Sequence, residues 1–371
     1  WLDGNNYFRA TSGIGMPFVY FTKDSESIAK IEINLGIVTV LNEKIIVEDA
    51  RNGADFIIYG PSGTIWNQNG STFTSNLNGN NYWSMVMAPN SNDNLVELAE
   101  EYLQYAYVFP QNTNVDWNYD EENAILTTEF YIDVDIKEGI YSKILQGLLP
   151  HQWNNLSFDS PNLFRQSYQT VRGELKTISE NYFKTENKFI GILPTLPLLG
   201  HYSEGYNPAE LEEKITQIEN DQLSTWTDSY NEGQVMNRLI QTARIAEQIG
   251  NQDGLNTIIQ TIKNRLEDWL TANSNEVAFI FYYNDTWSTM IGYPAGHGQD
   301  YNINDHHFHW GYFIHAAAFI EQYNPGWSND WGEMVNHLIR DAASTDRNDS
   351  LFPFLRSFSP FAGHCWANGF A

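Results

Sequence analysis

The sequence predicts a multidomain protein of mixed class, with an antiparallel β-sandwich first, a small α+β linking domain next and an array of helical hairpins last. Short stretches of β-branched and aromatic residues recur up to about Gly139. After Tyr206 the spacing of apolar residues changes from two to about 3.6, the helical period. A chain of 371 residues is also too long for one small domain. We place the domains at 1–146, 147–205 and 206–371.

The first domain should consist of many short strands. Gly, Asn, Ser and Pro separate the apolar stretches, a pattern typical of an antiparallel sandwich. One helix is expected over Asn92–Gln104 (NDNLVELAEEYLQ). The expected strands include Phe18–Phe21, Ile28–Leu35, Tyr82–Ala88, Tyr105–Phe109 and Ile125–Ile136.

The linking domain combines the strand-like run SYQTVRGELKTI with the Pro-rich run GILPTLPLLGH. Five helices should follow, joined mostly by short loops. The first is capped by Asn207, the second ends at Gly250, the third is capped by Asp253, the fourth begins at Asp305 and the fifth covers about 329–343. A β-like run, EVAFIFYYND, precedes the fourth. Since a ring of six hairpins needs twelve helices, we expect the domain to be cut short at its C-terminus.

The composition excludes several classes of partner. The formal charge of −26, from 46 acidic and 20 basic residues, would repel nucleic acids and anionic membrane surfaces. No apolar run reaches membrane-spanning length. Cys365 is the single cysteine, which excludes an internal disulfide and a Cys-based zinc site. The high aromatic share of 15% fits sugar stacking and ordinary core packing equally well.

The most informative feature is a histidine-rich run around one carboxylate. Five of the nine histidines fall between His297 and His315, around Asp305 in NINDHHFHWGYFIHAAA. We expect Asp305 to cap a helix and to lie one turn from His309, because residues four apart share a helix face.

Three interpretations of this run remain open. In the first, Asp305 is only a cap and the histidines pack as polar aromatics. In the second, His306 or Asp305 pairs with His309 as metal ligands, but no second cluster with ligand spacing accompanies them. In the third, Asp305 protonates a leaving group and His309 orients it or tunes its pKa. We expect acid–base chemistry without a metal or other cofactor.

Two further segments carry candidate binding residues. In TDSYNEGQVMNRL, Asp228 and Tyr230 lie at the start of an expected helix. In GHCWANG, several polar and aromatic side chains lie among glycines. A Cys–His nucleophile in GHCWANG is disfavoured, because sequence neighbours rarely point at one another. For every binding candidate, packing in the core is as compatible with the sequence as a substrate contact. The substrate-binding candidates are Tyr230, Tyr293, His306, Trp310, Tyr312, His364 and Trp366.

The runs NDHHFHWGYFIHAAA, GHCWANG and DSYNEGQVMNRLIQTARIAEQIG resemble those of glycoside hydrolase family 81, endo-β-1,3-glucanases that act on laminarin and curdlan. Upstream, GIGMPFVYF, GLLPHQWNNL and YQTVRGELKTI occur in the expected order. The resemblance implies a β-sandwich, a linking domain and an (α/α)6 toroid. It also implies a secreted monomer whose partner is β-1,3-glucan polysaccharide, with no cofactor, nucleic acid or membrane partner.

The same resemblance implies an inverting mechanism, in which one carboxylic acid protonates the glycosidic oxygen and a second carboxylate, roughly 6.5–9.5 Å away, activates water. Asp305 matches the general acid of the family, and His309 matches its companion. In the family, a Glu that follows the GHxWAxG run supplies the base. We therefore expect the base beyond Ala371, more sandwich sequence before Trp1, and little hydrolysis by these 371 residues alone.

Two other classes of protein compete with this interpretation. A non-catalytic β-glucan-binding protein on the same scaffold would keep the aromatic residues without needing Asp305 and His309 together. A polysaccharide lyase on a helical toroid would bind anionic uronates, which a chain with a formal charge of −26 would repel. No Lys/Arg cluster accompanies the histidine-rich run, which disfavours the lyase.

Overall fold

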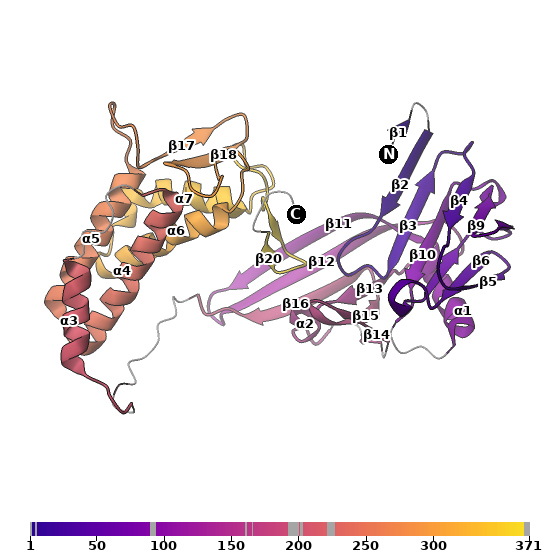
Figure 1. Cartoon of the computed structure of the whole chain (residues 1–371), viewed down its shortest axis with the longest axis horizontal. Helices are drawn as coiled ribbons and strands as arrows, with labels where there is room; N and C mark the ends of the chain where they lie inside the picture. The colour runs from indigo at the N-terminus through magenta and orange to yellow at the C-terminus, as the bar shows by residue number, and fades with distance from the viewer. Residues whose placement is uncertain are drawn as a thin grey trace. The chain divides into compact units, whose positions relative to one another are not determined.

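The computed structural model describes residues 2–3, 6–89, 94–159, 162–164, 166–191, 200, 203–220 and 227–366. The chain divides into two compact units, Trp1–Ile192 and Leu193–Ala371. The first holds the long strands and the second holds most of the helices (Figure 1). The predicted mixed, multidomain class is confirmed, whereas the three-domain division at 146 and 205 stays a prediction.

The first unit is built on a seven-stranded antiparallel sheet, covered on both faces. A three-stranded sheet packs on one face, where Phe73 shares a core with Ile45 and Trp83. Helix α1 (Leu95–Ala106) packs on the other, where Tyr102 contacts the ring of Phe18. The larger sheet has the order β1 (Leu2–Asp3), β2 (Asn6–Thr11), β3 (Phe18–Lys23), β10 (Tyr82–Met87), β7 (Phe56–Tyr59), β6 (Lys44–Glu48) and β5 (Ile37–Leu41), and the smaller has β4 (Ala29–Glu32), β9 (Thr72–Ser75) and β8 (Asn67–Asn69).

Two more three-stranded antiparallel sheets complete the first unit. One has the order β11 (Val108–Asp120), β12 (Ile125–Ile136) and β16 (Tyr182–Lys188). The other has the order β13 (Leu145–Leu148), β15 (Gly173–Ser179) and β14 (Ser167–Thr170), with the short helix α2 (Pro150–Trp153) beside it.

Two expected strands of the first unit differ from the structure. The strand expected over Ile28–Leu35 is shorter, because β4 ends at Glu32. The expected strand over Tyr105–Phe109 is wrong in its first half, because α1 continues to Ala106 and β11 begins only at Val108. Leu98, Tyr102 and Tyr105 lie on one buried face of α1, so the helical period extends further than the β-like letters suggest. Most of the Pro-rich run GILPTLPLLGH lies outside the described residues.

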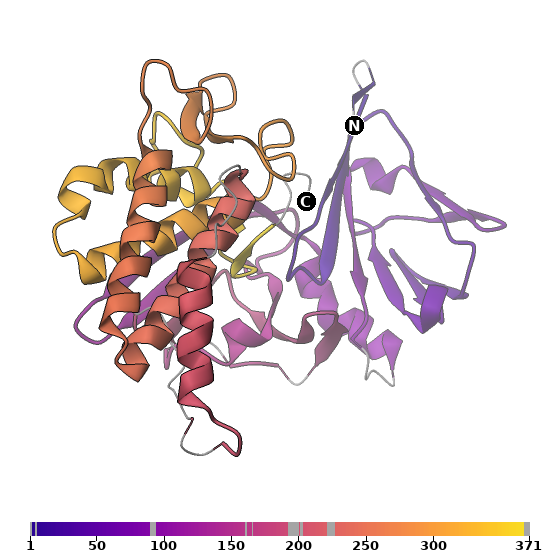
Figure 2. The ribbon, with the colours of Figure 1, turned by 60° about the vertical axis from the view of Figure 1, so that its left-hand side comes forward.

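The five helices expected in the second unit are confirmed, and they pack around a common apolar core. Helix α4 packs against both α5 and α6, and α6 against α7 (Figures 1 and 2). Their closure into a ring of six hairpins stays a prediction. The elements are α3 (Pro208–Glu219), α4 (Ser229–Ile249), α5 (Gln252–Leu270), the hairpin β17 (Ile280–Asn284) and β18 (Thr289–Tyr293), α6 (His306–Tyr323), α7 (Ser328–Ala343), and the pair β19 (Phe358–Ser359) and β20 (His364–Cys365).

The helix ends test the predicted caps. Asn207 caps α3, and Gly250 ends α4 with a left-handed backbone (φ 80°), both as expected. The predicted cap of α5, Asp253, is wrong. The side chain of Asn251 accepts the N–H of Gly254 at 2.8 Å, and Asp253 instead lies in the first turn, where its charge favours the helix dipole. Over the described ranges, no helix has the length and apolarity needed to cross a bilayer.

Candidate active site

A pocket of about 490 Å³ in the second unit contains the predicted acid, and we call it the Asp305 pocket. Among its lining residues, Asp305 is the single carboxylate. Amides, an imidazole, a guanidinium and two indoles surround it, a mixture of flat apolar faces and polar groups suited to a neutral polar ligand. The lining residues are Trp287, Asn302, Ile303, Asn304, Asp305, His306, Arg356, Ser357, Phe358 and Trp366.

Asp305 occupies the N-cap position of α6, yet its side chain caps nothing, so the predicted capping hydrogen bond is wrong. Its backbone is left-handed (φ 56°), which turns the carboxylate away from the N–H groups of the first turn. The carboxylate instead accepts a hydrogen bond from Asn304 Nδ2 at 2.8 Å. Ile303 is also left-handed (φ 50°), and each such residue costs about 1–3 kcal/mol. The Asp305 carboxylate therefore does not serve as the cap of α6.

His309 is fully buried and faces α4. Its Nδ1 lies 2.8 Å from Ser229 Oγ, and its Nε2 has no hydrogen-bond partner among the described residues. Among the described residues the imidazole of His309 makes no hydrogen bond to the Asp305 carboxylate, so the companion role of His309 stays a prediction. Burial, reinforced by His306 and His297, lowers the pKa of His309 to about 4, which makes its imidazole neutral near pH 7.

A pH titration should therefore find no protonation of His309 between about pH 5.5 and 8. The folded pKa lies below the ordinary value of 6.5, so below about pH 6.5 the unfolded chain takes up a proton that the folded chain does not. Stability should fall as the pH drops from about 6.5 to 4, and less steeply in His309→Gln. Proton NMR of the imidazole, assigned by the loss of its signal in His309→Gln, measures this. A midpoint above about 6 would contradict the buried, neutral state.

Asp341 of α7 was missed by the sequence analysis, although it organises the rear of the pocket. It is fully buried, and burial raises its pKa, but the interactions with His306, Arg356 and Trp310 outweigh burial and hold the pKa below its usual range. Asp341 lies three residues after Leu338, on the buried face of α7. A carboxylate at this helical spacing from apolar residues is the sequence feature that could have identified it. Its carboxylate accepts hydrogen bonds from His306 Nδ1 (2.6 Å), Trp310 Nε1 (2.5 Å), Arg356 Nη2 (2.8 Å), Thr289 Oγ1 (3.0 Å) and the Met290 N–H (3.0 Å).

These contacts correct two predicted substrate contacts. Trp310 is fully buried and its indole N–H binds Asp341, so it belongs to the core and its predicted stacking role is wrong. His306 lines the pocket, but Nδ1 faces Asp341 and Nε2 lies 3.0 Å from the carbonyl oxygen of Gln299. Both ring nitrogens are therefore engaged within the protein, and neither is left for a hydroxyl of a substrate.

Tyr230 and Tyr312 form a separate aromatic cluster and do not line the Asp305 pocket. The Tyr230 ring lies 4.5 Å from that of His297, edge to face, and 5.9 Å from that of Tyr312. Gly233 permits this packing, because a Cβ at that position would lie 2.5 Å from the Tyr312 ring. The third tyrosine candidate, Tyr293, is 47% exposed at the end of β18 and also lies outside the pocket lining.

The C-terminal candidates contact each other. His364 Nδ1 donates to the carbonyl oxygen of Cys365 (2.9 Å), and its ring meets Trp366 edge to face at 4.7 Å. Trp366 lines the Asp305 pocket. Trp287, which the sequence analysis missed, lines it as well and is 63% exposed in the turn between β17 and β18. The sequence feature that could have identified Trp287 is its place in the polar run NDTW, which is typical of an exposed turn and not of a core.

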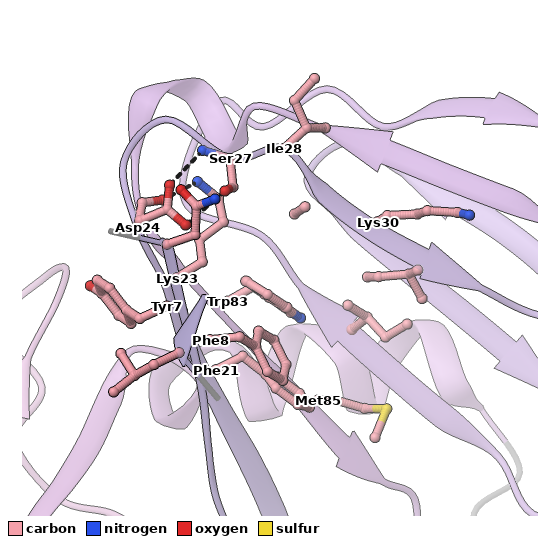
Figure 3. A pocket seen from close by; sticks show the side chains of 15 residues that line it. Tyr7, Phe8, Phe21, Lys23, Asp24, Ser27, Ile28, Lys30, Trp83 and Met85 are labelled. Carbon is pink, nitrogen blue, oxygen red and sulfur yellow. Dashed lines mark hydrogen bonds between the residues drawn. The ribbon is translucent and has the colours of Figure 1, made fainter. Parts of the chain in front are cut away.

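A second hollow, of about 530 Å³, lies in the first unit (Figure 3). Its walls are mainly apolar, with the rings of Phe21 and Trp83 stacked 5.1 Å apart. Its carboxylate, Asp24, accepts hydrogen bonds from the Ser27 N–H and Oγ, and Lys23 Nζ donates to the Asp24 carbonyl oxygen. Because Asp24 is occupied in this turn, the Asp305 pocket is the better candidate active site. Within the described ranges, no group of three or more His, Cys, Asp or Glu side chains is arranged to hold a metal ion.

Comparisons with known proteins agree on one family. The model of the glycosyl hydrolase family 81 C-terminal domain matches residues 207–371. "Glucan endo-1,3-beta-D-glucosidase" of Acetivibrio thermocellus is 39% identical over 100% of this chain and 47% of its own length. The protein of the same name from Thermobifida fusca is 36% identical over 100% of this chain and 48% of its own.

A solved structure agrees with these relatives. A mutant of "Glycoside hydrolase family 81 from Clostridium thermocellum" aligns with a TM-score of 0.82 and 37% identity, over 99% of this chain and 51% of that one. The chain spans about half the length of the relatives that it matches. Since the family model, both full-chain relatives and the solved structure agree, the chain belongs to glycoside hydrolase family 81.

Proposed function

We propose that the protein hydrolyses β-1,3-glucan of the laminarin and curdlan type within the polysaccharide chain, with Asp305 as the general acid. The observation that carries this is the Asp305 carboxylate, which caps no helix and lines a pocket together with two indoles. The relatives named glucan endo-1,3-beta-D-glucosidase support the same activity and substrate.

The proposed reaction inverts the anomeric carbon. Asp305 donates its proton to the glycosidic oxygen as the C–O bond breaks. A second carboxylate removes a proton from the water that attacks from the opposite face, which requires roughly 6.5–9.5 Å between the two carboxyl groups. We assign this base to no described residue. His309 remains the proposed companion of the acid, acting as a neutral imidazole.

The proposal also covers organisation and location. We propose a β-sandwich over 1–146, a linking domain over 147–205 and an (α/α)6 toroid fold over 206–371, in a secreted monomer. The sheet-covered first unit and the packed helices of the second support this arrangement. The family resemblance supports secretion and the monomeric state.

The test is to incubate the full-length protein with laminarin and to follow the anomers of the first products by proton NMR. We expect α-anomers to appear first, because attack from the opposite face inverts a β-linkage. Initial β-anomers would exclude inversion. Glucan binding without any product would favour the alternative, a non-catalytic β-glucan-binding protein on the same scaffold.

Trp287 should act as a stacking surface for a sugar ring. In an Asp305→Asn background, which slows turnover, Trp287→Ala should weaken binding of laminarihexaose by roughly 3- to 10-fold, since a flat aromatic contact contributes about 0.5–1.5 kcal/mol. Isothermal titration calorimetry measures this. Trp287→Phe keeps a flat ring and should lose less, and Tyr282→Ala removes an exposed ring outside the pocket lining as a control. Unchanged affinity in Trp287→Ala would exclude the contact.

A further inference from the structure

Asn304 lies directly before the candidate acid, in the wall of the same pocket. Its Nδ2 donates to Asp305 Oδ2 at 2.8 Å. The amide nitrogen must face the carboxylate, because an ionised carboxylate only accepts hydrogen bonds. This orientation leaves Asn304 Oδ1 buried and without a hydrogen-bond partner within the described part of the chain. The carboxylate contact, and not the surroundings of Oδ1, therefore determines how the amide is turned.

The backbone holds this pair in place. Ile303 and Asp305, on either side of Asn304, are both left-handed (φ 50° and 56°), a conformation that a β-branched residue rarely adopts. The carbonyl oxygen of Asp305 accepts the N–H groups of Phe308 (2.9 Å) and His309 (3.0 Å), which ties the segment to the first turn of α6. Strain of this kind persists where the surrounding structure holds side chains in a required position.

Resting on the function proposed above, we propose that Asn304 is a positioning residue that decides which oxygen of Asp305 carries the transferable proton. The Asn304 N–H keeps Oδ2 as a hydrogen-bond acceptor, so the proton of the acid form resides on Oδ1. Oδ1 has no hydrogen-bond partner among the described residues and is left to face the glycosidic oxygen. As the C–O bond breaks, the proton passes from Oδ1 to that oxygen. The Asn304 N–H then stabilises the new carboxylate, because a hydrogen bond to an ionised acceptor is stronger.

Measuring kcat on two substrates distinguishes a positioning role of Asn304 from a purely structural one. Laminaripentaose needs a proton on its leaving oxygen, whereas 2,4-dinitrophenyl β-laminaritrioside releases a phenolate that needs none. Asn304→Ala should lower kcat on laminaripentaose by roughly 10- to 100-fold, a part of what general acid catalysis contributes. On the dinitrophenyl substrate kcat should fall by less than about 3-fold, since the proton is no longer required. Asn304→Asp keeps the shape of the side chain but loses the donor, and should show the same split if the Ala variant does not fold.

The control is Asn302→Ala, which removes an amide of the same loop and pocket that makes no recorded hydrogen bond to Asp305. Any loss in this variant should be equal on the two substrates. Equal losses in the Asn304 variants, or no loss on either substrate, would overturn the positioning role while the proposed function stands. Wild-type protein that cleaves neither substrate would overturn the proposed function, and the role of Asn304 with it.

Discussion

Asp305→Asn should lower the rate of laminarin hydrolysis by roughly 10²- to 10⁴-fold, the range that a general acid contributes. The amide keeps the size of the side chain but is far too weak an acid to protonate a leaving alkoxide. Because the wild-type carboxylate caps no N–H group of α6, the substitution should leave the helix and the pocket intact. Initial rates on an unactivated glucan, with thermal unfolding as a check on folding, measure the effect.

The matched control for this substitution is Asp330→Asn, an exposed carboxylate in the first turn of α7 and outside the pocket lining. It should retain wild-type rates, since it removes the same charge without touching the site. Near-normal turnover in Asp305→Asn would refute its role as the acid, and the carboxylate would then be a pocket-lining group only.

Asp341→Ala should destabilise the fold by about 3–5 kcal/mol, because removing one partner of a buried ion pair leaves the others uncompensated. Arg356 and His306 would both lose their carboxylate, and the indole N–H of Trp310 would lose its acceptor. Urea denaturation at pH 7 measures the free energy of unfolding. The control on the same helix, Asp330→Asn, should stay within about 0.5 kcal/mol of wild type. A loss below about 1 kcal/mol in Asp341→Ala would contradict the argument.

The same substitution should change how stability depends on pH. The folded pKa of Asp341 lies below the ordinary value of 3.8, so its contribution is complete above about pH 5 and is lost as the pH falls through the folded value. Between about pH 5 and 3, wild-type protein should therefore lose stability more steeply than Asp341→Ala. If the free energy of unfolding changes with pH equally in the two proteins, the partners of Asp341 do not lower the pKa of its carboxyl group in the folded state.

The sequence was sufficient for the helices and for the place of the candidate acid at the start of one of them, since both depend on local patterns. Residue types at helical spacing predicted five helices, and the carboxylate among histidines predicted the position of Asp305. The pairing of Asp305 with His309 depended on both residues being helical. With φ 56° at Asp305 that condition fails, and a backbone angle of this sign is decided by the surrounding loop and not by the residue itself.

The rest of the site depends on contacts between segments far apart in the chain. Asp341 binds groups from β18, α6 and the segment before β19, and no spacing within α7 reveals which donors will meet it. Trp310 and Trp287 are both tryptophans near the pocket, yet one is buried and the other is 63% exposed. Composition cannot separate two such indoles, because their burial follows from packing between elements.

The hairpin that carries Trp287 is anchored at its second strand and at the last residue of its turn, Ser288, whose carbonyl oxygen accepts a hydrogen bond from Arg356. Thr289 and Met290 are bound to Asp341, whereas the turn before them projects an exposed indole. Residues 285–287 can therefore change in sequence during evolution without loosening the pocket wall behind the candidate acid. Relatives that favour different branching patterns in their substrate should differ most at this turn, while the two anchoring positions and the buried carboxylate stay the same.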